Sequence, residues 1–143
     1  MGRRGLLAAA LAAGALVAGC GDEESTAPTF SGSDEEQVAG TVNAMTGAIA
    51  AGDGELACGL MTEAGQALML EMGRQAGGDG VSGCESAVPA VEAAGFDPGD
   101  FRIKPADVSA GVEGAQAVCD LQGAFILTRT DEGWRVDVPY CSY

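Results

Sequence analysis

Five cysteines and no histidine set the chemistry open to this 143-residue chain. Cysteine sulfur can form disulfides, bind a metal or carry an acyl group. The positions 20, 58, 84, 119 and 141 contain no C-x-x-C pair, and without histidine a mixed zinc site lacks its second ligand type. We expect no metal. Four cysteines beyond Cys20 favour two disulfides in an exported protein, with three possible pairings and buried free thiols as the alternative.

Cys20 ends an apolar run and is followed at once by acidic residues. Two arginines precede the run LLAAALAAGALVAG (6–19), whose length and small terminal residues match a secretory signal peptide. A membrane-spanning helix needs about 20 apolar residues, more than this run supplies. The stretch Val17-Ala18-Gly19-Cys20 resembles the lipobox of bacterial lipoproteins. This resemblance implies that the Cys20 sulfur carries a diacylglyceryl group and that cleavage removes residues 1–19.

The lipid would place the protein on the cell membrane, facing outside the cytoplasm. Two acyl chains hold a protein stably on a bilayer, whereas one holds it marginally. The sequence therefore predicts an extracytoplasmic lipoprotein, with the membrane bound through palmitate-type chains at its N-terminus.

The charge of the chain is strongly acidic, with 7 basic and 21 acidic side chains. Nucleic acid repels such a domain, so we expect no nucleic-acid partner. Residues 21–33 are rich in Ser, Thr, Gly, Pro and acid, which is typical of a disordered tether. The expected organisation is a signal peptide (1–19), a lipidated cysteine with an acidic tether (20–33), and one domain (34–143).

The domain begins with helical periodicity. Ser33 and Glu36 form a capping box for a first helix, which Gly52 ends. Its predicted buried stripe is Val38, Val42, Met45 and Ile49.

Asp53 can cap a second helix that runs through Met61. Thr62 can cap a third helix that runs to about Arg74. Their expected apolar side chains are Leu56 and Leu60, then Leu68, Leu70 and Met72.

The stretch 84–94 predicts a fourth helix that contains Pro89. Either this helix begins near Ser86, with the proline in its first turn, or it kinks. The glycine patterns at 52–57 and 78–83 spell dinucleotide-binding motifs, but helices rather than strands precede them, so we expect no cofactor.

The period changes from 3.6 to 2 near the C-terminus. The predicted core face of the last strand is Trp134, Val136, Val138 and Tyr140. A turn at 131–133 joins this strand to a preceding strand at 124–130. Two earlier strands are predicted, one at 115–121 and a fainter one near 102–110. Helices followed by meandering strands predict an α+β fold, with helices packed on one face of a curved antiparallel sheet.

Three stretches stand in order after the first helix: AAGDGELACGLMT (50–62), GCESAV (83–88) and DEGWRVD (131–137). In this order they resemble small exported members of the nuclear transport factor 2-like superfamily. The resemblance implies a cone between helices and sheet, and a Cys58–Cys84 disulfide. We expect Cys119–Cys141 as the second disulfide, for which the tail after Pro139 must bend.

The superfamily includes isomerases, dehydratases, binders and structural subunits, so the resemblance leaves the function open. Its enzymes place Asp, His or Tyr in the cone. Asp107, Asp120 and Asp137 could supply a general base, but alternation sets Asp137 opposite the Trp134 face. We expect a non-catalytic module that binds an unidentified small molecule or protein. The alternative is a small isomerase- or dehydratase-like enzyme that uses a pocket carboxylate.

Overall fold

The computed structural model describes residues 27–95, 102–119 and 123–142. The helices are α1 (Asp34–Ala50), α2 (Gly54–Gly59), α3 (Glu63–Gly77) and α4 (Cys84–Ala93), with short 3₁₀ turns η1 (Gly78–Gly80) and η2 (Pro105–Asp107). The strands are β1 (Val108–Ala110), β2 (Gly114–Val118), β3 (Ala124–Thr130) and β4 (Gly133–Ser142). The predicted signal peptide, Cys20, Asp120 and most of the tether lie outside the described residues.

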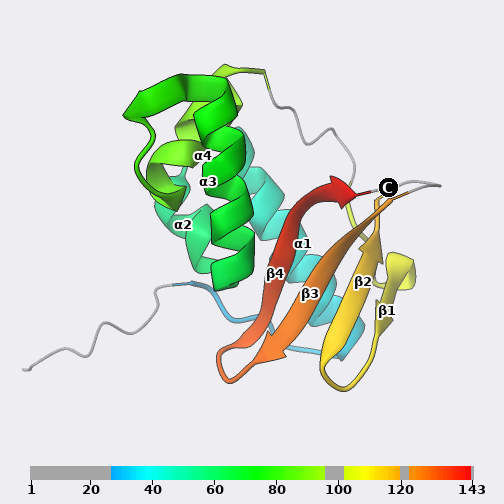
Figure 1. Ribbon diagram of the computed structural model, residues 1–143. Coiled ribbons are helices and arrows are strands. Elements are labelled where there is room, and N and C mark those ends of the chain that lie inside the picture. The colour runs from blue at the N-terminus through cyan, green and yellow to red at the C-terminus, as the bar shows by residue number, and fades with distance from the viewer. Residues whose placement is uncertain (1–26, 96–101, 120–122, 143) are drawn as a thin grey trace, which may run out of the picture.

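The four strands form one antiparallel meander in the order β1-β2-β3-β4. Helix α1 lies across one face of this sheet, and α2, α3 and α4 gather beside β4 (Figure 1). The α+β class is therefore confirmed, with one helix on the sheet face and three at its β4 side.

Helix α1 begins as the sequence predicts. The Ser33 hydroxyl accepts the Glu36 N–H, and the Glu36 carboxylate accepts the Ser33 N–H, which completes the capping box. The predicted stripe is fully buried in all four positions: Val38, Val42, Met45 and Ile49. The helix ends before Gly52, whose φ of +69° suits glycine.

The folded part extends N-terminally of Asp34 into the predicted tether. The Phe30 ring lies against Gly40 of α1, and Ala27 lies against Gly59 of α2. A side chain at either glycine would collide with this segment or push it off the helix. Residues 27–30 therefore pack on the domain, although their composition suggests disorder.

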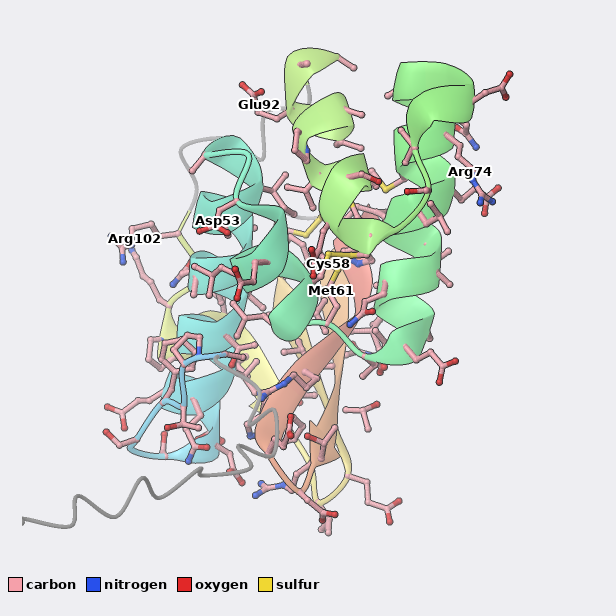
Figure 2. The ribbon with its side chains drawn as sticks, turned by 90° about the vertical axis from the view of Figure 1, so that its left-hand side faces the viewer. Asp53, Cys58, Met61, Arg74, Glu92 and Arg102 are labelled. Atoms are coloured by element: carbon pink, nitrogen blue, oxygen red, sulfur yellow. A yellow bond between two sulfur atoms is a disulfide. The ribbon has the colours of Figure 1, made fainter. Side chains whose placement is uncertain are left out.

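The connection between α2 and α3 pairs with the outer edge of β4. The Val136 N–H donates to Leu60 O at 2.9 Å, and the Thr62 N–H donates to Val136 O at 3.0 Å. Met61, between them, forms a parallel bridge with Val136 and lies at the end of α2 (Figure 2). We call this backbone pairing the β4 seam.

Helix α3 approaches the β4 seam through glycine. A Cβ on Gly65 would lie closer than 3.0 Å to Val136 O, and one on Gly73 would lie equally close to Ala87 of α4. Its buried residues are Gly65, Met69 and Gly73. The apolar residues expected on this helix, Leu68, Leu70 and Met72, are half-buried, and Leu70 and Met72 pack against the core.

Helix α4 starts at Cys84, so Pro89 lies in its interior rather than in its first turn. Proline has no N–H to donate to the carbonyl oxygen of Glu85. That carbonyl faces Gly54 at the start of α2, so closely that a Cβ there would lie nearer than 3.0 Å. The proline therefore coincides with a close backbone contact between two helices.

The core face of β4 changes along the strand. Trp134 and Val136 are 2% and 0% exposed, as predicted. The pairing then passes from Leu127↔Val136 to Ile126↔Val138, so β4 contains one extra residue, a β-bulge. This residue turns Val138 to the opposite face, where it pairs with Ile126. Val138 and Tyr140 are half-buried, which corrects their assignment to the core face.

Two disulfides join segments that are distant in sequence. Cys58 of α2 is bonded to Cys84 of α4, and Cys119 after β2 is bonded to Cys141 of β4, in agreement with the expected pairs. A further register shift between Val138 and Ser142 gives β4 the bend that Cys141 needs to reach across the end of β3. Each bond closes a loop of 22 to 26 residues, worth about 3 kcal/mol if loop-closure entropy dominates.

Gly65→Ala is expected to destabilise the domain by about 1–3 kcal/mol, because the added methyl group would collide with Val136 O. Urea unfolding followed by circular dichroism measures this change. Gly47→Ala in α1 is the matched control, since nothing from the rest of the fold lies within 4 Å of where its methyl group would be, and should stabilise by about 0.5–1 kcal/mol. Equal stabilisation by both variants would contradict the close packing at the β4 seam.

Candidate functional site

The space between α1 and the sheet is the first place to look for a site, because the superfamily resemblance implies a cone there. It is filled by apolar side chains. Those that the sheet directs toward α1 are at most 4% exposed: Ala115, Ala117, Phe125, Leu127, Trp134 and Val136. The four residues of the α1 stripe interleave with them at 0% exposure.

Three polar or charged residues are buried among the described residues: Thr41, Thr46 and Arg135. The two threonine hydroxyls donate to carbonyl oxygens of their own helix, Gln37 O and Asn43 O. Arg135 Nη1 donates to Trp134 O at 2.9 Å, and Nη2 lies 3.4 Å from the Glu132 carboxylate. The described interior thus presents no carboxylate for proton transfer.

Asp137, one candidate general base, lies on the face opposite Trp134, as alternation predicts. Its carboxylate accepts two hydroxyl hydrogen bonds, from Thr62 at 2.7 Å and from Thr128. The same Thr62 oxygen accepts the Gly65 N–H at the start of α3. Asp137 therefore links β3, β4 and the N-terminus of α3, and both of its oxygens have structural partners. Asp137 is half-buried, so it is not simply a solvated acid on the sheet surface.

The other two candidate bases lie elsewhere. Asp107 is exposed in η2, where its carboxylate accepts the Lys104 N–H at 2.9 Å. Asp120 lies outside the described residues. The structure therefore does not bring Asp107 and Asp137 together, and it places neither of them in the interior.

Trp134, the single tryptophan of the chain, is buried beneath the Arg129 side chain. The Arg129 guanidinium lies 4.6 Å from its ring centre, in cation–π geometry, and forms an ion pair with Asp34 of α1. The indole Nε1 is buried without a hydrogen-bond partner among the described atoms. This surrounding fixes the ring in the core and gives it no access to solvent.

Two hollows lined by described residues lie on the outside of α3. One of about 320 Å³ is lined by Leu68, Glu71, Met72, Gln75 and Tyr140. Another of about 430 Å³ continues past Met72 and Gln75 to the end of α4. Leu68 and Met72, both half-buried, thus line a shallow groove, and Met72 also packs against the core.

An acid, Glu71, and a tyrosine, Tyr140, both line this groove, and both are side-chain types that can transfer protons. Glu71, however, is exposed to solvent. A general base acts on a proton within hydrogen-bond reach in a site that holds the substrate, and an open groove on the outer surface supplies no such enclosure. The groove therefore lacks the enclosure of a reaction chamber.

Among residues 27–95, 102–119 and 123–142, no three cysteine, aspartate or glutamate side chains are placed to hold a metal ion. Within the same ranges, no helix combines the length and apolarity needed to cross a bilayer. Comparison with protein-family models, curated proteins and solved structures found no match to this chain.

Asp137→Asn should lower the free energy of unfolding by about 1–2 kcal/mol, because it weakens two hydrogen bonds to a charged acceptor. Asp107→Asn, which removes the same charge from an exposed acid with one backbone partner, should cost less than about 1 kcal/mol. Thermal and urea unfolding of both variants measures the difference. Equal effects would show that the Asp137 network contributes nothing beyond its charge.

Proposed function

We propose that this protein is an exported lipoprotein, anchored to the cell membrane through Cys20, whose domain serves as a non-catalytic interaction module. The observation that carries the non-catalytic part is the filled interior. Enzymatic use of the fold would need a cavity with a polar group, and the described core between α1 and the sheet consists of apolar side chains at 0–4% exposure. A ligand or partner protein would then bind on the outer surface of the domain.

Export is supported by two independent features. The sequence Val17-Ala18-Gly19-Cys20 stands at the end of an apolar run of signal-peptide length. The four remaining cysteines are joined in two disulfides, which persist outside the reducing cytosol. A domain whose strands and helices are cross-linked in this way suits an extracytoplasmic location.

The relationship to the nuclear transport factor 2-like superfamily is part of this proposal. It is supported by the order of the elements, with helices before an antiparallel meander, and by the link from α2 to the start of α4. The packing of Trp134 against the α1 side adds to this support. The fold class alone, α+β, carries no function.

The anchor is tested by expressing the full chain in a bacterial host that processes lipoproteins. We expect the wild-type protein in the membrane fraction, with a mass that shows a diacylated N-terminal Cys20. Cys20→Ala should lose the lipid while leaving the four domain cysteines intact, and should not be recovered as a membrane-anchored product. A wild-type chain found soluble with an unmodified Cys20 would end this part of the proposal.

A further inference from the structure

A small pocket lies at the edge of the core, where the chain that leads into α1 passes the β3–β4 turn (Figure 1). It is lined by residues 28–30, by Gln37 and Thr41 of α1, and by residues 132–135 of the hairpin. Its volume is about 120 Å³, close to that of a cavity of roughly 150 Å³ that holds one benzene molecule. Two of the lining residues, Thr29 and Glu132, are exposed, so the pocket opens on the outer surface of the domain.

A buried cation lines this pocket. Arg135 is 5% exposed, and its guanidinium makes two hydrogen bonds within the described residues, to Trp134 O and to the Glu132 carboxylate. A guanidinium has five N–H groups to donate. The contact with Glu132 is 3.4 Å long, and the Glu132 side chain is 62% exposed. The buried positive charge is therefore only partly compensated.

A second buried donor belongs to the same lining. Trp134 is 2% exposed, and its indole Nε1 has no hydrogen-bond partner among the described atoms. A buried N–H without an acceptor costs free energy, and such groups are normally paired. The third buried polar group of the lining, the Thr41 hydroxyl, already donates to Gln37 O at 2.9 Å. The donors left to a ligand are thus a cation and a neutral N–H.

We propose that this pocket binds a small carboxylic acid in its ionised form, with the Arg135 guanidinium and the Trp134 indole N–H as its donors. A carboxylate offers only acceptors, and its two oxygens match the fork of an arginine. The volume of about 120 Å³ limits the ligand to acids of about four to six heavy atoms, such as acetate or propionate. This inference rests on the binding role proposed above but needs neither the lipid nor export, so it can fail while they stand.

Glu132 is the group that the ligand would replace. Its single contact with Arg135 is long and its side chain is largely in solvent, so turning it outward costs little. The net charge of −14 repels anions, but at physiological ionic strength exposed charges beyond about 8 Å are largely screened. Glu132 is therefore a weak internal competitor for the same guanidinium, and it is the acid whose removal should matter.

The test follows the indole N–H of residues 20–143 with Cys20→Ser, a chain that contains every described helix and strand and both disulfides. The single tryptophan gives one indole resonance in a ¹H–¹⁵N spectrum. Sodium acetate up to about 100 mM, at constant ionic strength, covers the affinities open to a ligand of about four heavy atoms. We expect a saturable downfield shift of this resonance. A resonance that acetate leaves unmoved would mean that water alone fills the pocket, and would overturn the proposal.

Acetamide is the matched probe, because it has the shape of acetate without the charge. It should bind at least about fivefold more weakly, since hydrogen bonds between ionised partners are the stronger ones. Equal affinities for acetate and acetamide would exclude a carboxylate site.

Two neighbouring acids separate the local effect from the overall charge. Glu132→Gln removes the competitor and should tighten acetate binding at least about fivefold. Asp131→Asn removes the same charge from the adjacent turn residue, which is not part of the lining, and should change the affinity less than about twofold. Equal tightening by both variants would show a response to net charge alone and would contradict the proposed site.

Arg135→Gln removes the cation and should abolish the saturable shift. Circular dichroism and thermal unfolding check that the variant folds. If it does not, Arg135→Lys replaces it, which keeps the charge but loses the planar fork, and should weaken acetate binding at least about fivefold. Undiminished binding by the folded variant would overturn the proposal.

Discussion

The backbone pairing of Val136 with Leu60 and Thr62 is the contact on which the rest of the structure depends. β4 is the last strand of the sheet, and an open strand edge would expose unpaired N–H and C=O groups to other chains. The two hydrogen bonds, of 2.9 and 3.0 Å, satisfy this edge from within the same molecule. They also fix the three-helix group to the sheet, because Thr62, which makes one of them, is the N-cap of α3.

This pairing helps to explain why the interior is closed. With α2 and α3 held at the β4 edge and α1 on the sheet face, the apolar side chains of all three meet in one cluster. The Cys58–Cys84 disulfide holds α2 against α4 just before the seam. A cavity under the sheet would need some of these side chains to be absent or smaller. The described interior thus serves the stability of the fold.

Sequence patterns predicted the features that depend on neighbouring residues. The capping box of Ser33 and Glu36, the cap at Thr62 and the stripe of α1 are local signals of this kind. The hydrophobic pattern did not predict that Gly65 and Gly73 lie on the buried face of α3. Glycine allows neighbouring elements to approach the helix closely but adds no apolar side chain. The bulge in β4 depends on its register with β3, and the Asp137 network depends on a threonine 75 residues away.

The central claim, a closed interior, is tested most directly by the fluorescence of Trp134, because the chain contains no other tryptophan. The ring is 2% exposed and lies under the Arg129 guanidinium. The account predicts blue-shifted emission and weak quenching by acrylamide in the folded protein, with strong quenching after unfolding. Red-shifted emission that acrylamide quenches readily in the folded protein would show an interior open to solvent, and would contradict the account.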